Sequence, residues 1–190
     1  MSYQHHPVRL VGGRICLDFL NTANWTSDGR IADERLASVK DLAIWCDAVG
    51  LHDLVMPGEE RLQKDVLEFR NTLRNIIVTL VLGNEPASPD IEDFNRTVTR
   101  TETYQLMKPS HGGLAFGSQT TFTKAISLLA VSLLGDAHEI ARVKLCPSDN
   151  CGWLFLDESK NRRRQWCAMD LCGNRAKARR HYRRKQLETP

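Results

Sequence analysis

The stretch that decides how this chain folds spans residues 146–185 and reads CPSDNCGWLFLDESKNRRRQWCAMDLCGNRAKARRHYRRK. Its four cysteines form two pairs, Cys146 with Cys151 and Cys167 with Cys172, and each pair encloses four residues. Fifteen residues separate the pairs, and the second pair leads directly into the most basic segment of the protein. The pattern predicts a small module in which the four cysteines share one task.

Matched Cys-x4-Cys pairs are typical of a structural zinc site. Thiolates are strong ligands for Zn²⁺, and four of them complete a closed tetrahedral shell. We therefore predict one structural Zn²⁺ ion, and its predicted ligands are Cys146, Cys151, Cys167 and Cys172. Disulfides or free thiols are the alternatives. A catalytic zinc ion is disfavoured, because such sites keep an open position and normally use histidine or carboxylate ligands.

The N-terminal residues 1–7 lack the apolar stretch of a secretory signal peptide. The sequence also has no apolar run approaching the roughly 20 residues that cross a bilayer. We therefore expect a soluble cytoplasmic protein without a membrane partner, and disulfides are rare in that compartment. Cys16 and Cys46 lie among apolar neighbours and are expected to be buried as small hydrophobic residues.

Within the module, residues 153–156 form a candidate strand that we expect to pair with residues 162–167 across a turn. Cys172 is expected in the first turn of a C-terminal helix, where the helix dipole favours a thiolate. A hairpin followed by a helix is treble-clef-like. Because about 40 residues bury little surface alone, we expect zinc to supply the stability of this module. Its removal would then unfold residues 146–185 and leave the rest folded.

The formal net charge of +3 is unevenly distributed. Residues 142–190 carry 13 basic and 5 acidic side chains, a net charge of +8, whereas residues 1–141 carry 13 basic and 18 acidic side chains, a net charge of −5. A Zn²⁺ ion bound by four thiolates contributes a charge of −2, which leaves the module at about +6. The asymmetry predicts that only the C-terminal module meets a polyanion.

The basic side chains flank the second cysteine pair, and several recur at helical spacing, so that they share one face of the predicted helix. Arginine suits phosphate and guanine recognition because its guanidinium binds in a bidentate manner. The predicted nucleic-acid contacts are Arg162, Arg163, Arg164, Arg175, Lys177, Arg179, Arg180, Arg183 and Arg184. Arg175 and Arg179 are expected nearest to the bases. The alternatives are a solvated basic helix or an arm that binds an acidic partner protein.

Residues 1–141 are expected to form a mostly helical domain, and residues 142–190 the zinc module. Apolar periodicity and capping residues predict the helices, and these span residues 39–49, 59–82, 88–100 and 122–134. Short strands are expected at residues 8–11, 103–108 and 114–117, and residues 25–32 are expected to form a polar loop. The predicted fold class is mainly α, of the α+β type.

Four polar side chains of the N-terminal domain are candidates for binding a small ligand: Asp18, Asn21, Arg70 and Arg74. Asp18 and Asn21 interrupt an apolar segment, and Arg70 and Arg74 lie one turn apart on a predicted helix. Their alternative roles are hydrogen bonding to neighbouring backbone and surface ion pairing. The domain has no phosphate loop, nucleophile elbow or paired acid and base, so we expect no enzymatic activity.

Several motifs resemble those of a known family. Cys172-Gly173-Asn174-Arg175, with Trp166-Cys167 before it, resembles the CGNR zinc finger, and Cys146-Pro147 and Cys151-Gly152-Trp153 resemble its first Cys-x4-Cys knuckle. Leu17-Asp18-Phe19-Leu20-Asn21-Thr22 resembles the signature of the ABATE domain, which precedes that finger. Phe69-Arg70-Asn71-Thr72-Leu73-Arg74 resembles its helical Leu-Arg-x-x-Leu-Arg segment, with Phe69 in place of leucine.

The resemblance implies a stress-induced bacterial transcriptional regulator, in which the finger binds DNA and the ABATE domain senses an unknown small-molecule effector. It carries over the four cysteine ligands and no effector-binding residue. The expected partner is duplex DNA, and binding to a two-fold DNA site would require a homodimer. The alternative function is a zinc-stabilised module that binds protein or RNA without sequence-specific DNA binding.

Overall fold

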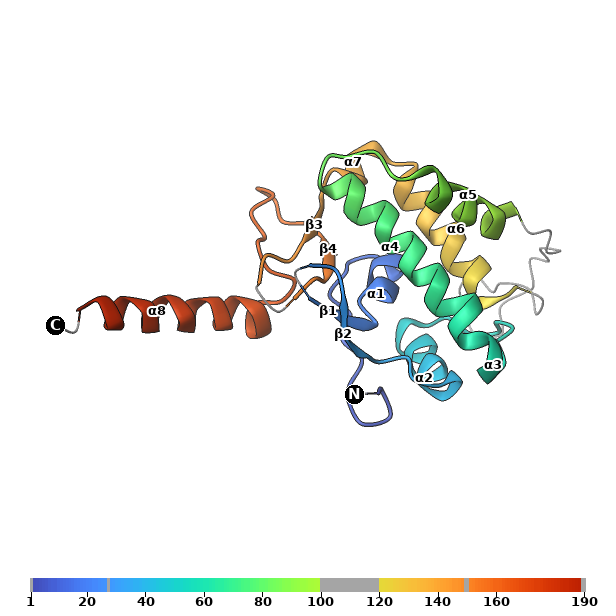
Figure 1. The fold of residues 1–190 in the computed structure, drawn as a ribbon, viewed down its shortest axis with the longest axis horizontal. Coiled ribbons are helices and arrows are strands. Elements are labelled where there is room, and N and C mark those ends of the chain that lie inside the picture. Colours follow the sequence, from blue (N-terminus) through green and yellow to red (C-terminus); the bar gives the residue numbers. More distant parts are fainter. Residues whose placement is uncertain (1, 27, 100–119, 149–150, 189–190) are drawn as a thin grey trace.

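The structure is a computed structural model that describes residues 2–26, 28–99, 120–148 and 151–188. It is a helical body with two small antiparallel hairpins and a long C-terminal helix (Figure 1). The helices of the described chain are α1 (Ile15–Leu20), α2 (Val39–Val49), α3 (Glu59–Arg61), η1 (Leu62–Leu67, π-helical), α4 (Glu68–Val81), α5 (Ser88–Thr99), α6 (Phe122–Leu134), α7 (Ala137–Ile140), η2 (Met169–Gly173, π-helical) and α8 (Asn174–Glu188). The strands are β1 (Ala23–Trp25), β2 (Ile31–Glu34), β3 (Val143–Leu145) and β4 (Leu154–Leu156). The predicted fold class is confirmed.

The helices begin and end where local chemistry dictates. The Ser38 side chain caps α2 by accepting a hydrogen bond from the backbone N–H of Asp41, and Gly50 ends the helix at a φ of 73°. Thr121 caps α6 in the same way, through the backbone N–H of Lys124. Because these signals are local, the sequence predicted residues 39–49 and 122–134 as helices correctly.

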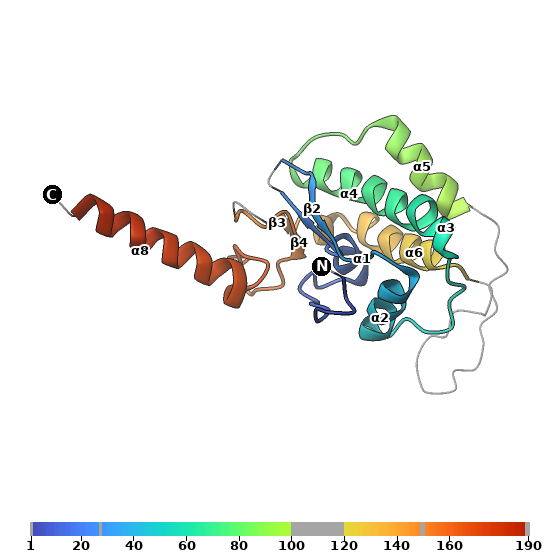
Figure 2. The same ribbon diagram turned by 60° about the horizontal axis from the view of Figure 1, so that its bottom comes forward.

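The core of the body is aromatic. Phe19 on α1 lies 5.9 Å from Trp45 on α2 and 5.2 Å from Phe122 on α6, measured between ring centroids, with edge-to-face geometry. Phe69 on α4 stacks with Phe94 on α5 at 6.1 Å. These contacts place α1 at the centre of the helical layer, surrounded by α2, α4 and α6 (Figures 1 and 2).

The strand predictions needed correction. Residues 8–11 form no strand, whereas part of the predicted polar loop belongs to the β1–β2 hairpin, in which Ala23 pairs with Glu34 and Asn24 with Asp33. The second hairpin pairs β4 with β3, and not with residues 162–167 as expected. Local sequence patterns identify candidate strands but not their partners, and here the partner lies upstream. The strands predicted at residues 103–108 and 114–117 lie outside the described residues.

The β3–β4 hairpin is part of the interior of the body. Leu154 and Leu156 are fully buried in the same apolar cluster as Leu17 and Leu20 of α1. The backbone N–H of Leu156 donates to the carbonyl oxygen of Gly12 at 2.8 Å. The segment that carries the cysteines therefore packs into the helical body.

In contrast to the β3–β4 hairpin, helix α8 lies outside the body. It projects away from the rest of the molecule in both views (Figures 1 and 2). Of its described side chains, Asn174 to Gln186, none is buried. In the described ranges, no helix is long and apolar enough to cross a membrane.

Candidate metal centre and nucleic-acid interface

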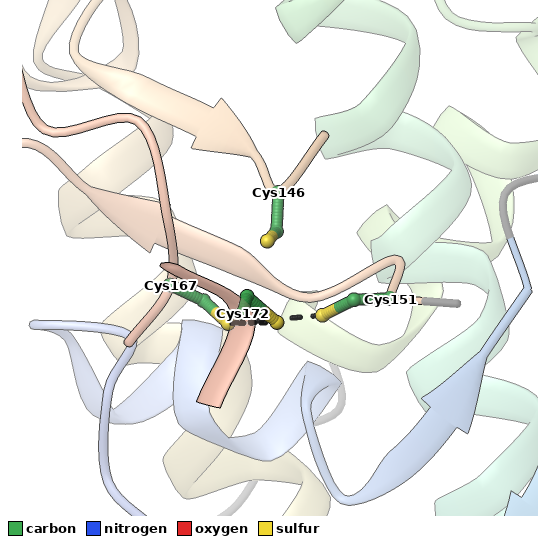
Figure 3. A group of neighbouring side chains, drawn as sticks. All are labelled: Cys146, Cys151, Cys167 and Cys172. Atoms are coloured by element: carbon green, nitrogen blue, oxygen red, sulfur yellow. Dashed lines mark hydrogen bonds between the residues drawn. The ribbon is translucent and has the colours of Figure 1, made fainter. Parts of the chain in front are cut away.

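The four predicted ligands converge on one point. The sulfur atoms of Cys146, Cys151, Cys167 and Cys172 lie within 4.8 Å of one another, and all four residues are buried (Figure 3). The Cys151 and Cys167 sulfurs are 3.7 Å apart, and the Cys167 and Cys172 sulfurs 3.6 Å apart. A tetrahedron with Zn–S bonds of about 2.3 Å has edges of about 3.8 Å. The donor set therefore fits one structural zinc ion.

Cys146, Cys151 and Cys167 also change one another's pKa values. Hydrogen bonding with Cys151 lowers the pKa of Cys146 to about 2, whereas hydrogen bonding with Cys146 and with Cys151 raises the pKa of Cys167. Without a cation, Cys151 and Cys167 therefore favour the protonated thiol. Zinc binding displaces these protons, because its ligands must be thiolates.

Local backbone structure sets the four sulfurs in place. Cys146 directly follows β3, and its N–H donates to the carbonyl oxygen of Trp153 at 2.9 Å. Cys172 lies in η2, immediately before α8. A Cβ at Gly173 would lie 2.5 Å from the sulfur of Met169, an exposed side chain that would have to shift, and 3.3 Å from the indole of Trp166.

Gly152 brings the finger against the body. A Cβ at this position would lie 2.7 Å from Cβ of Trp25 and 3.0 Å from a guanidinium nitrogen of Arg74. Trp25 and Ala23 of β1 belong to the same buried cluster as the four cysteines. The glycine therefore allows the first knuckle to rest directly on the β1–β2 hairpin.

Two arginines lie beside the thiolates. Nη2 of Arg175 donates to the sulfur of Cys172 at 3.2 Å, and its Nε donates to the carbonyl oxygen of Leu171. Arg74 is 5% exposed, stacks on the ring of Trp25 at 4.0 Å, and its Nη1 has no hydrogen-bond partner among the described residues. Burial lowers the pKa of Arg74 to about 10, and the neighbouring Arg70 cation acts in the same direction. Both cations offset the charge of −2 that a zinc tetrathiolate carries.

The predicted ligand-binding residues of the body are tied into the fold. Asp18 accepts hydrogen bonds from the backbone N–H groups of Val11 and Gly12 at 2.8 and 2.7 Å, and burial raises its pKa to about 6. Asn21 hydrogen-bonds both the N–H and the C=O of Leu154, at 2.9 and 2.8 Å. Asp18 thus holds the loop before α1, and Asn21 fastens α1 to β4.

The arginines of α4 are also engaged. Arg70 is fully buried, binds the Glu34 carboxylate with both terminal nitrogens, and donates to the hydroxyl of Thr22 at 3.0 Å. Together with Arg74 it lies over the ring of Trp25, at 5.6 Å. The structure therefore brings Arg70 and Arg74 together around one tryptophan.

Arg164 departs from the other predicted nucleic-acid residues. Its guanidinium donates to the backbone carbonyl oxygens of Trp166, Leu156, Val11 and Cys167 and lies 4.5 Å from the ring centroid of Phe155. These bonds use its donors within the protein and fasten the second knuckle to the N-terminal segment. Arg164 is therefore placed as a structural clamp.

The remaining predicted contacts lie at the surface. Arg162 and Arg163 are exposed in the turn after β4, where Arg162 adopts a φ of 53°. The other five are distributed along α8, and these are Lys177, Arg179, Arg180, Arg183 and Arg184. Arg175 is at the helix start and contacts the metal centre. The structure thus separates one arginine beside the zinc ligands from a row farther along the helix.

Sequence reasoning missed several residues that hold the site. Trp153 donates its indole N–H to the carbonyl oxygen of Ala23 at 2.9 Å. Asp157 is fully buried and accepts hydrogen bonds from Lys144, Ser159 and the backbone of Arg164, and despite its burial the bonds from Lys144 and Ser159 lower its pKa. An aspartate directly after a strand and two residues before a serine is a recognisable turn signal.

A cavity of about 550 Å³ lies between the β1–β2 hairpin and the metal centre. Asn24, Trp25, Arg35 and Trp153 line it together with the zinc ligands Cys151, Cys167 and Cys172. Arg35 lies over the ring of Trp153 at 5.4 Å, and its buried Nε has no hydrogen-bond partner among the described residues. The cavity contains none of the four predicted ligand-binding residues.

The helical body and the four-thiolate centre define a zinc-finger protein whose finger is built into an N-terminal domain. The chain belongs to the ABATE family, described as "Putative stress-induced transcription regulator", whose model matches residues 13–142. The model of the CGNR zinc finger matches residues 142–185. No curated protein matches the chain in sequence. The resemblance seen in the sequence is therefore confirmed.

Proposed function

We propose that this regulator binds duplex DNA through α8. The observation that carries the proposal is a 15-residue helix whose described side chains are all outside the core and which is built largely from arginine and lysine. Like charges one turn apart destabilise an isolated helix. A polyanion removes that repulsion, so the exposed helix is suited to a phosphate backbone.

The geometry of the zinc module favours a nucleic-acid-binding role for α8 over the alternative of a solvated basic helix. The major groove of DNA admits an α-helix, and the metal centre anchors the first turn of α8 through Cys172. Arg175 is occupied with the Cys172 sulfur. Phosphate contacts are therefore assigned to the arginines farther along the helix and to Arg162 and Arg163.

Measuring the affinity for duplex DNA at several salt concentrations tests this function. If about five phosphates are neutralised, log K falls with log salt at a slope near −4.5. The triple variant Arg179→Gln, Arg180→Gln, Arg183→Gln should reduce the magnitude of that slope by about 3. Arg61→Gln, which removes an arginine that is 77% exposed on the body, is the matched control and should leave the slope unchanged.

Two results would contradict DNA as the partner. Salt-independent affinity for duplex DNA would exclude a phosphate-directed mode. Structured RNA that outcompetes duplex DNA would favour the RNA alternative.

We further propose that an effector acts at the 550 Å³ cavity between the β1–β2 hairpin and the finger. Its volume is in the usual range for ligand sites, and such sites favour interfaces. Asp18, Asn21, Arg70 and Arg74 would then support the fold rather than contact the effector. The proposal places the protein in the cytoplasm with its DNA and includes no catalysis, because four thiolates leave zinc no open position.

A small-molecule screen by thermal unfolding tests the effector site. A true effector should raise the unfolding temperature of the wild type and not that of Arg35→Ala. A compound that stabilises both proteins equally binds elsewhere.

A further inference from the structure

A second cavity lies where α8 leaves the finger. Its volume is about 270 Å³, and it separates the first knuckle from the helix. Its lining comes from three segments that the zinc centre brings together: Pro147, Ser148, Trp166, Ala176, Arg179, Arg180 and Arg183. The family descriptions of this chain assign no role to the 270 Å³ cavity.

The helical part of the lining is one stripe. Ala176, Arg179, Arg180 and Arg183 are spaced three, four and seven residues apart, so they project from the same side of α8. The small side chain of Ala176 leaves space at the end of the stripe nearest the knuckle. Lys177, His181 and Arg184, with Arg180, line a separate depression on the neighbouring side.

The described lining of this cavity is positively charged. Three of its lining residues are arginines, and the described lining includes no carboxylate. Arginine binds phosphate oxygens in a bidentate manner, which suits a phosphodiester.

Trp166 supplies an apolar wall at a fixed position. Its carbonyl oxygen accepts a hydrogen bond from Nε of Arg164 at 3.1 Å, and the missing side chain of Gly173 lets its indole lie against the helix start. An aromatic surface beside guanidinium groups complements a phosphate that carries a sugar ring. An acidic peptide without an apolar side chain would use the arginines and leave the indole uncovered.

We propose that this cavity holds one backbone unit of the bound DNA strand, with the phosphate between Arg179 and Arg183 and the deoxyribose against Trp166. This inference rests on the proposed DNA-binding function. It deepens that function by naming the side of α8 that faces the strand and by adding the first knuckle to the interface. The side of α8 that carries Lys177 and Arg184 then faces away from this strand.

The test uses the full chain with zinc bound and compares matched substitutions. Ala176→Leu fills the cavity without changing charge, and loss of one charged hydrogen bond there should weaken duplex binding about tenfold. Ala178→Leu, an exposed alanine of the same helix, is the control and should bind as the wild type does. Arg183→Gln should lower the salt slope by about 1, whereas Arg184→Gln should change it little.

A second readout follows the indole N–H resonance of Trp166, assigned with Trp166→Phe, during titration with the thymidine dinucleotide pTpT and with duplex DNA. The inference predicts that both shift this resonance in the wild type and not in Ala176→Leu. Duplex binding without such a shift, and with equal effects of Ala176→Leu and Ala178→Leu, overturns it. A larger shift with polyglutamate also overturns it, in favour of an acidic peptide.

The experiments distinguish a failure of the DNA-binding function from a failure of the nucleotide site in the cavity. If pTpT shifts the Trp166 resonance but duplex DNA does not bind, the DNA-binding function is wrong and the nucleotide site stands. If neither probe binds, both proposals are wrong.

Discussion

The two halves of the C-terminal module contrast sharply, although they are contiguous in the sequence. In β4, Leu154 and Leu156 are fully buried in the core of the body, and in α8 no described side chain is buried. Cys167 and Cys172 lie between β4 and α8 in the sequence, and their sulfurs lie within 4.8 Å of those of Cys146 and Cys151 (Figure 3). One half thus packs into the core of the body, and the other half lies outside it.

Zinc removal should cause the largest loss of folding stability, and it tests whether the buried half and the body unfold together. Structural zinc contributes about 10–16 kcal/mol of apparent binding free energy, which is comparable to the whole stability of a domain. Because β3–β4 is part of the main core, we now expect chelation or Cys167→Ser to unfold the body together with the finger. Calorimetry should show one cooperative transition in the zinc-bound protein and a lower unfolding temperature without zinc.

The matched control for this experiment is Cys46→Ala, which removes a buried thiol that is not a ligand. It should retain one zinc ion per chain. An unchanged transition of the body after complete zinc removal would show that the two segments fold independently.

A medium effect is expected at the contact between α1 and β4. Asn21→Ala leaves the buried N–H and C=O of Leu154 without partners, and each unsatisfied group costs about 1–3 kcal/mol. Urea unfolding should report a loss of about 2–4 kcal/mol with zinc still bound. Asn24→Ala, at a half-buried position of β1, is the control; equal losses in the two variants would contradict a special role of Asn21.

The smallest effect on stability should come from the exposed half. Ending the chain after Arg179 removes no buried side chain among the described residues, so the free energy of unfolding should change by less than about 0.5 kcal/mol. The same truncation should abolish duplex DNA binding. A stability loss above about 1 kcal/mol would indicate that α8 supports the fold after all.

The sequence predicted those features whose causes are local. Capping by Ser38, the apolar periodicity of the long helices and the matched cysteine spacing each act over a few residues, and the structure agrees with them. The contact between Asn21 and Leu154 could not be predicted, because it joins residues that are 133 positions apart in the chain. The inward turn of Arg164 has the same cause, since one of its acceptors is the carbonyl oxygen of Val11.

Helix α8 is fixed to the protein at one end, so a rotation at that end moves its other end the most. Fifteen helical residues span about 22 Å, and the fulcrum is η2, which contains the ligand Cys172. A tilt of about 10° at that end would displace the far end of such a helix by about 4 Å, which is enough to move an arginine off a phosphate. A small shift where the β1–β2 hairpin meets the zinc ligands would, by this geometry, produce a larger displacement of the residues that reach farthest from the body.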